Sequence, residues 1–274
     1  MLGVVFHATW SFVPRHTGGP IVDHSGAVAF DWFFYTAHSF RMQVFFLIAG
    51  FFGRMLYHKR GWAEFTRHRL ARIAVPLVVG WFILAPLNIA MFTWGGNASG
   101  GNVPPLPLPA LFDRMFAQGL LFVPRTSGGL FGLTHLWFLY YLLWIYLVAV
   151  SVRAVLTRVL PESLGLRRLA DWVAAQIAGS PWAIGWLTLF TGLFLWRMDG
   201  WTGVDTPVGT LKPAGPVLLL YGSFFTLGWL WHRQAGLLQQ LARHWKWQLA
   251  AGLAVSLVCF LGILRLLDTG YVAG

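Results

Sequence analysis

Apolar runs long enough to cross a bilayer recur along most of this chain. A membrane-spanning helix needs about 20 predominantly apolar residues. Hydrophobic residues make up 57% of the sequence and charged residues 11%, and the mean hydropathy of +0.62 lies outside the range usual for soluble domains. The sequence therefore predicts an all-α, polytopic transmembrane helix bundle, with spans at Met42–Tyr57, Ile73–Phe92, Leu133–Val152, Pro181–Trp196, Pro216–Trp231 and Gln248–Leu267.

A shorter apolar run, MLGVVFHATWSFV, opens the chain. We expect it to be the distal part of a truncated first span, which brings the number of spans to about seven. The run has no basic n-region, so a cleaved signal peptide is not expected. No hydrophilic segment is long enough for a second domain, so residues 1–274 form a single membrane-embedded domain. The Gly/Pro-rich segments Gly95–Pro109 and Gly200–Pro216 are predicted loops.

Charge placement predicts the orientation of the bundle. The segments Arg54–Arg72, Arg153–Asp171 and His232–Lys246 hold thirteen of the twenty Lys/Arg residues and three of the nine acidic residues. Under the positive-inside rule these segments are cytoplasmic. The net charge of +11 is explained by this topology, so a nucleic-acid partner is not expected. The single cysteine, Cys259, excludes a disulfide framework and a thiolate metal site, and no bound metal is expected.

Four polar residues stand out in or near the apolar runs. His7 lies inside the first run, where an imidazole can accept and return a proton; it can equally serve as a hydrogen-bonding group between helices. His38 and Arg41 are one helical turn apart at the expected outer end of the second span, where an arginine also snorkels. His135 opens the fourth run beside Trp137, in a region that resembles an interfacial aromatic belt.

A predicted basic loop joins the second and third spans. It carries five cations that face one side of the membrane: Lys59, Arg60, Arg67, Arg69 and Arg72. Arginine binds phosphate by planar, bidentate hydrogen bonds. Arg69 and Arg72 are three residues apart before Pro76, which would place them on one face. These cations therefore suggest a site for an anion, although topogenic charge alone also explains them.

Several blocks of the sequence resemble the integral-membrane acyltransferase-3 family. The blocks are GVVFHA, HSFRMQVFFLIAGFF, RHRLARIAVPLVVGW, THLWFLYYLLWIYL and YGSFFTLGWLWHRQ, in the family's order. They are most similar to its glucan-biosynthesis (glucan succinyltransferase) branch. The resemblance implies a multi-pass enzyme of the bacterial inner membrane that transfers an acyl group from cytoplasmic acyl-CoA to a hydroxyl of a carbohydrate, such as a periplasmic glucan. Succinyl-CoA is one candidate donor, and no bound cofactor is implied.

The resemblance also implies roles for individual residues. His7 matches the family's first-span histidine, a catalytic base or acyl carrier, and Arg69 and Arg72 match an RxxR motif associated with the acyl donor, with Arg67 and Lys59 beside it. His38, Arg41, His135 and Trp137 are candidates for contacts with the substrate or acyl group. The family's upstream arginine and its usual ten or so spans are missing, so we expect a fragment of a larger bundle, truncated at both ends.

Three other classes stay open on the sequence alone. A transporter or flippase would also have polar residues within a helix bundle. A haem protein would need two axial histidines, which His7, His38 and His135 offer. A structural membrane subunit would not explain why a basic loop and a His/Arg pair flank one helix.

Overall fold

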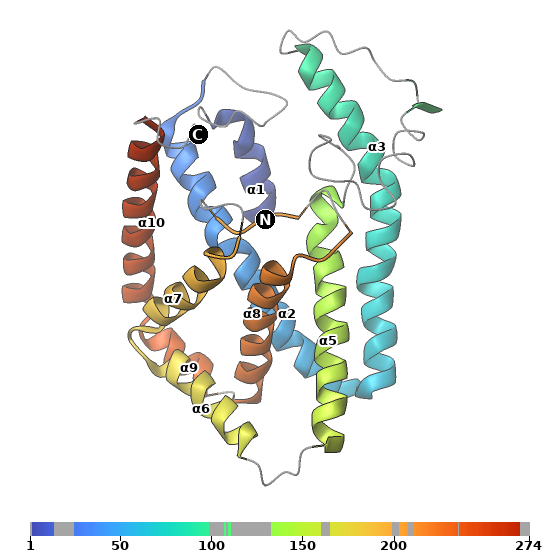
Figure 1. Ribbon diagram of the computed structural model, residues 1–274, viewed down its shortest axis with the longest axis vertical. Coiled ribbons are helices and arrows are strands. Elements are labelled where there is room, and N and C mark those ends of the chain that lie inside the picture. Colours follow the sequence, from blue (N-terminus) through green and yellow to red (C-terminus); the bar gives the residue numbers. More distant parts are fainter. Residues whose placement is uncertain are drawn as a thin grey trace.

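A computed structural model of the chain describes residues 2–13, 25–98, 107, 109–110, 133–159, 165–198, 203–207, 211–234 and 236–268. Every regular element in these ranges is helical, as predicted (Figure 1). The elements are α1 (Leu2–Thr9), a 3₁₀ turn (Trp10–Phe12), α2 (Val28–Arg69), a π-helical segment (Leu70–Ala74), α3 (Val75–Ala98), a 3₁₀ turn (Thr134–Leu136), α5 (Trp137–Val159), α6 (Leu166–Gly179), α7 (Ala183–Leu195), α8 (Gly215–Arg233), α9 (Leu237–Arg243) and α10 (Trp245–Asp268).

The predicted spans overlap the helices α2, α3, α5, α7, α8 and α10, although their bounds differ. By length and composition, three helical stretches of the described chain can cross a membrane: Val28–Leu84, Trp137–Arg158 and Trp245–Leu266. The first stretch folds back on itself, because it contains α2, the π-helical segment and the first part of α3 (Figure 1). The apolar helices Leu2–Phe12 and Gly185–Leu195 are shorter than a span. The described residues thus form an all-helical structure with three candidate membrane spans, and the predicted number of about seven spans stays a prediction.

The two predicted loops are only partly non-helical where the structure describes them. The segment expected to start at Gly95 continues α3 as far as Ala98, and residues 99–106 and 108 lie outside the described residues. In the second loop the described residues, 203–207 and 211–214, are not helical, and α8 begins at Gly215.

The helix α2 is longer than predicted, because it begins at Val28 rather than at Met42. His38 and Arg41 therefore lie within this helix and not at its outer end, which corrects the prediction. Asp31 and His38 lower the hydropathy of this part, so an apolar run was not visible in the sequence. Its aromatic residues nevertheless pack on α1: the rings of Phe6 and Phe34 stack with centroids 4.2 Å apart.

The predicted basic loop between the second and third spans is also wrong, because this segment is helical. A single residue, Gly61, leaves the helical conformation (φ 75°, ψ 172°) and bends the chain. The helix resumes to Arg69 and passes into the π-helical segment, in which the Val75 N–H donates to the Leu70 carbonyl. Pro76 has no N–H for a regular helical bond, and a π turn is one way to accommodate such a break.

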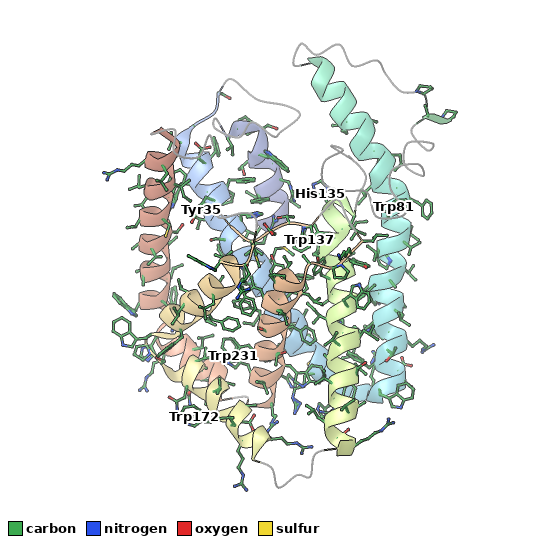
Figure 2. All side chains as sticks on the ribbon, viewed as in Figure 1. Tyr35, Trp81, His135, Trp137, Trp172 and Trp231 are labelled. Carbon is green, nitrogen blue, oxygen red and sulfur yellow. The ribbon has the colours of Figure 1, made fainter. Side chains whose placement is uncertain are left out.

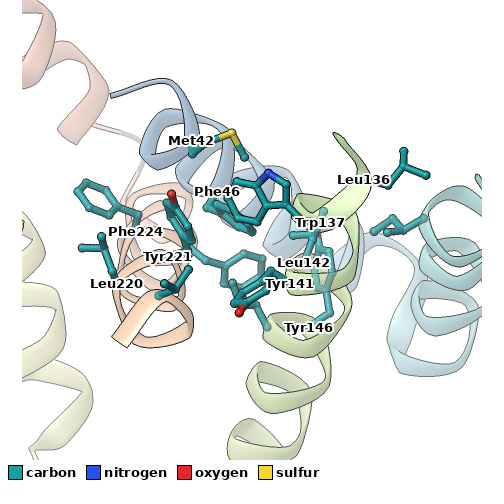
Figure 3. Close-up of a cluster of buried hydrophobic side chains, with 14 of the residues drawn as sticks. Met42, Phe46, Leu136, Trp137, Tyr141, Leu142, Tyr146, Leu220, Tyr221 and Phe224 are labelled. Carbon is teal, nitrogen blue, oxygen red and sulfur yellow. The ribbon is translucent and has the colours of Figure 1, made fainter. Parts of the chain in front are cut away.

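The core lies where α2 crosses α8 and α5 (Figure 3). A Cβ atom at Gly50 would collide with the carbonyl oxygen of Phe225, and one at Gly228 would collide with that of Leu47. Small residues allow such close approach between membrane helices. One helical turn before Gly50 and Phe225, the rings of Phe46 and Tyr221 stack with centroids 4.6 Å apart. The close contact at this crossing therefore holds α2 and α8 together.

The three basic segments lie at one end of the bundle, as the charge pattern predicts (Figure 1). They comprise the α2–α3 junction, the end of α5 with α6, and the end of α8 with α9 and the start of α10. We call this the basic end. The helix α1 and the carboxyl ends of α3 and α10 lie toward the opposite end (Figure 1).

Candidate active site

Two histidines from distant parts of the sequence meet at the amino-terminal end of α5. His135, labelled in Figure 2, lies away from the basic end. His7 is on α1, and His135 is in the 3₁₀ turn that precedes α5. Their rings are edge to face with centroids 4.6 Å apart. This contact leaves no room for a haem between the two imidazoles. Within the described residues there is also no group of three His, Cys, Asp or Glu side chains that could hold a metal ion.

The pair from α2 joins the same site through Phe6. The Arg41 guanidinium carbon lies 3.9 Å from the centroid of the Phe6 ring, and the His38 ring stacks on that ring at 5.7 Å. A cation over an aromatic face is attracted by the ring quadrupole. His38 and Arg41 thus share a face of α2, as their spacing predicts, and both are close enough to His7 for their charges to interact.

One nitrogen of Arg41 is available to bind a ligand. Its Nη1 atom is buried and has no hydrogen-bond partner among the described residues. A buried guanidinium N–H without an acceptor is costly, so an anionic group beside it would be stabilised. We call His7, His38, Arg41 and His135 the histidine–arginine cluster.

Aromatic side chains lie on the core side of this cluster. Trp137 is buried, with its ring 5.8 Å from that of Tyr221 and 5.7 Å from that of Tyr141 (Figure 3). Tyr221 is 2% exposed and close enough to Arg41 for an electrostatic interaction. Trp137 therefore supports the site from the core. The sequence reading missed Phe6 and Tyr221, although both lie in the blocks that resemble the family, GVVFHA and YGSFF.

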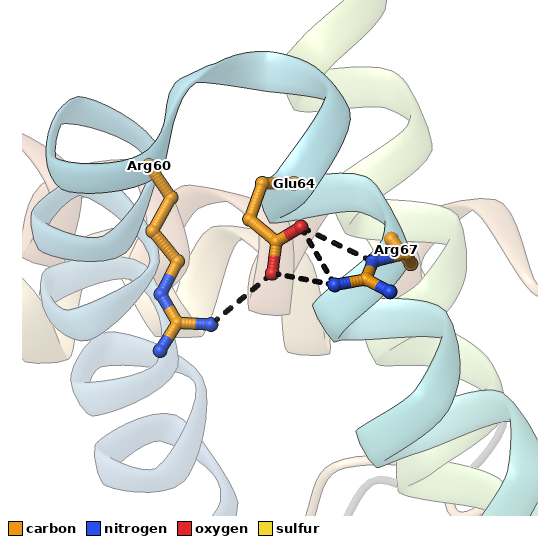
Figure 4. Close-up of polar contacts among 3 residues, drawn as sticks. All are labelled: Arg60, Glu64 and Arg67. Carbon is orange, nitrogen blue, oxygen red and sulfur yellow. Dashed lines mark hydrogen bonds and ion pairs between the residues drawn. The ribbon is translucent and has the colours of Figure 1, made fainter.

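The cations predicted to bind an anion lie at the basic end in different environments. Arg67 forms two hydrogen bonds with Glu64, of 3.1 and 3.2 Å, and Arg60 lies 3.5 Å from the same carboxylate (Figure 4). Lys59 and Arg72 are exposed. The structure brings Arg60 and Arg67 together around Glu64 but places Arg69 in a separate, more buried position.

Arg69 faces the protein. Its guanidinium lies 5.0 Å from the centroid of the Tyr146 ring and 5.5 Å from that of Phe65, and it donates to the Phe52 carbonyl at 3.4 Å. Arg72 follows within the π-helical segment and is exposed, so the two arginines do not share one environment. Of the predicted donor residues, Arg69 is the one whose position is fixed by contacts with the core.

The histidine–arginine cluster and the basic end are far apart along α2. Arg41 and Arg54 are on one continuous helical stretch, and a rise of 1.5 Å per residue separates them by about 20 Å. A substrate that contacts both regions must therefore extend through the bundle along α2.

The comparisons with known proteins give one result. The family model described as an acyltransferase domain matches residues 1–272, almost the whole chain. No curated protein and no solved structure matches. The chain therefore belongs to the acyltransferase-3 family and is a membrane acyltransferase.

Proposed function

We propose that this enzyme transfers an acyl group from acyl-CoA, bound at the basic end, to a hydroxyl of a carbohydrate at the histidine–arginine cluster. The contact between His7 and His135 beside Arg41 carries the proposal. It combines a group that can take a proton with a cation that can bind negative charge, in a site with aromatic side chains on its core side. The resemblance of the HSFRM and THLWFLYY blocks to the glucan branch supports a periplasmic glucan as acceptor and a succinyl group as one acyl group.

In the simplest mechanism His7 is a general base. Its unprotonated ring nitrogen takes the proton of the acceptor hydroxyl as the oxygen attacks the thioester carbonyl carbon. The C–O bond forms, the C–S bond breaks, and the thiolate of coenzyme A leaves with the proton from the imidazolium. His135, in ring contact with His7, orients the imidazole.

A two-step route uses the same residues. The His7 nitrogen attacks the thioester and releases the thiolate, and the acyl-imidazole then passes its acyl group to the hydroxyl. This route allows donor and acceptor to bind at different times. That order suits a substrate path along α2, with the donor on one side of the membrane and the acceptor on the other.

Arg41 is the proposed partner of negative charge. Its free Nη1 atom is suited to the carboxylate of a succinyl group or to the oxyanion that forms on the thioester carbonyl. His38 stacks on Phe6, which also lies under Arg41, and so holds the guanidinium in place.

At the other end, Arg69 is the proposed primary contact of the donor phosphates. It is held by the Phe65 and Tyr146 rings, whereas Arg72 and Lys59 are exposed cations that attract the donor. Arg67 contributes less because Glu64 binds it. Under the positive-inside rule this end is cytoplasmic, and we assign the protein to a bacterial inner membrane.

Thioester cleavage in proteoliposomes tests the proposal. The purified protein is reconstituted and supplied with acyl-CoA and a glucan, and both free coenzyme A thiol and acylated glucan are measured. If transfer is direct, we expect both products to appear in equal amounts and only when the glucan is present. If His7 is acylated first, one thiol per protein should be released in the absence of the glucan. A transporter or flippase would move its substrate with no release of thiol, and this result would refute the proposal.

A further inference from the structure

An apolar groove runs between α5, α6, α7 and α8, apart from the histidine–arginine cluster. Its volume is about 890 Å³, and none of the four residues of that cluster lines it. Two of the lining residues, Leu193 and Leu219, are 65% and 62% exposed, so the groove opens on the surface of the bundle. Exposed apolar surface of this kind on a membrane bundle is suited to contact with lipid.

Three polar side chains, Gln176, Ser223 and Thr226, interrupt an otherwise apolar and aromatic lining. The hydroxyls of Ser223 and Thr226 donate to the carbonyls of Leu219 and Gly222 in their own helix, at 2.7 and 2.8 Å. Hydroxyls bound in this way offer little to a ligand. The wall therefore suits a hydrocarbon chain.

Arginines gather where the groove reaches the basic end. Val152 and Leu230 line the groove, Arg153 follows Val152 directly, and Arg233 is one turn beyond Leu230. Arg54 of α2 is close enough to Arg153 and Arg233 for their charges to interact. We call these three residues the inner arginine cluster. Trp172 also lines the groove and lies toward the same end of the bundle, where it is labelled in Figure 2. This position is typical of a tryptophan at the headgroup level.

The inner arginine cluster carries more positive charge than its neighbours balance. Asp171 forms an ion pair with Arg233 and accepts from the Gln234 side chain at 3.2 Å. Among the described residues it is the one carboxylate in ion-pair contact with the cluster. Arg153 lies over the Tyr57 ring at 4.9 Å, and the Nε atom of Arg54 is buried with no hydrogen-bond partner in the part of the chain that the structure describes. The cluster therefore favours an anion.

We infer that an anionic phospholipid binds here, with its phosphate at the inner arginine cluster and one acyl chain in the groove. The basic end of a membrane bundle lies at the level of the headgroups, where arginine binds phosphate strongly. A neutral lipid would fill the groove but leave the charge unbalanced. A soluble anion would balance the charge but leave the groove unfilled. This site is independent of the proposed acyl transfer.

Thermal unfolding of the full chain tests the inference, and sixteen tryptophans report it by intrinsic fluorescence. The protein in a neutral detergent is titrated with phosphatidylglycerol or with phosphatidylcholine. We expect phosphatidylglycerol to raise Tm in a saturable manner and phosphatidylcholine to raise it much less. The Arg54→Gln/Arg153→Gln double variant should lower the apparent affinity for phosphatidylglycerol about tenfold or more. Arg233 stays intact in this variant because Asp171 depends on it.

Matched controls separate headgroup from chain. Arg158→Gln/Arg265→Gln loses the same charge at two exposed positions and should keep the lipid response. A side chain at Gly222 meets nothing within 4 Å, so Gly222→Phe should occupy the groove and abolish the response with the arginines in place. Gly262→Phe, equally open on α10, should not.

Three outcomes would overturn the inference. The first is an equal rise of Tm with both lipids, and the second is an unchanged lipid response in the Arg54/Arg153 variant. The third is stabilisation by coenzyme A in the absence of anionic lipid, if the same variant abolishes that stabilisation; the cluster would then bind a soluble phosphate.

Discussion

The rings of His7 and His135 lie edge to face with their centroids 4.6 Å apart. One comes from the first helix and the other from the turn before α5, so only the folded bundle brings them together. Arg41, held over Phe6, lies beside them, so the proposed proton acceptor is close to a cation. The packing of α1 on α2 is therefore as important for the site as the histidines themselves.

We predict that His7→Ala lowers the rate of acyl transfer by about 10²–10⁴-fold, the usual contribution of a general base. His135→Ala should cause a smaller loss, because it removes a group that orients His7. Release of coenzyme A thiol by reconstituted protein measures both effects. His244→Ala, between α9 and α10, is the matched control and should transfer normally. Wild-type transfer by a well-folded His7→Ala protein would remove His7 from the mechanism.

The donor site should respond unequally to its two motif arginines. Arg69→Gln should raise the KM for acyl-CoA about tenfold with little change in kcat, since it removes a charge-assisted contact made throughout the reaction. Arg72→Gln should have a weaker effect of the same kind, because Arg72 is exposed. Initial rates at varied acyl-CoA give both constants.

Arg265→Gln, at the opposite end of the bundle, controls for the loss of one charge and should leave the donor KM unchanged. If Arg69→Gln left the KM unchanged as well, Arg69 would not bind the donor.

The crossing of α2 and α8 should be intolerant of even a methyl group. In Gly50→Ala and Gly228→Ala the new Cβ meets backbone atoms, which cannot move away as a side chain can. Each substitution should cost about 1–3 kcal/mol or more, the range for overpacked sites. Thermal unfolding in detergent measures the loss, and Gly222→Ala in α8, with open space around it, should be neutral. Unchanged Tm values in both variants would show that the helices are further apart.

The bend within α2 depends on one glycine. Gly61 has φ 75° and ψ 172°, a region that is essentially restricted to glycine. Gly61→Ala should destabilise the protein by about 1–3 kcal/mol, and nothing lies within 4 Å of the added Cβ to account for the loss by a clash. Gly185→Ala in α7 is equally uncrowded and has no positive φ, so its Tm should match that of the wild type.

The sequence by itself determined the class of the molecule. Apolar runs of spanning length predict membrane helices, since lipid accepts few other backbone structures, and the distribution of Arg and Lys predicts which segments share an end. Local chemistry also placed His38 and Arg41 on one helical face, as their spacing requires. That His7 and His135 meet was not predicted from the sequence.

Only the tertiary structure decided how the charged segments are arranged. Hydropathy placed the start of the second span at Met42 because it does not register aromatic packing, whereas α2 begins at Val28 and packs on α1 through Phe34 and Phe6. A run of cations looks the same whether it is a loop or a bent helix, and the bend depends on the conformation of Gly61 alone. Which arginines face inward follows from contacts with distant rings, such as Tyr146 for Arg69 and Tyr57 for Arg153. Such contacts join residues far apart in the chain, and local sequence patterns carry no record of them.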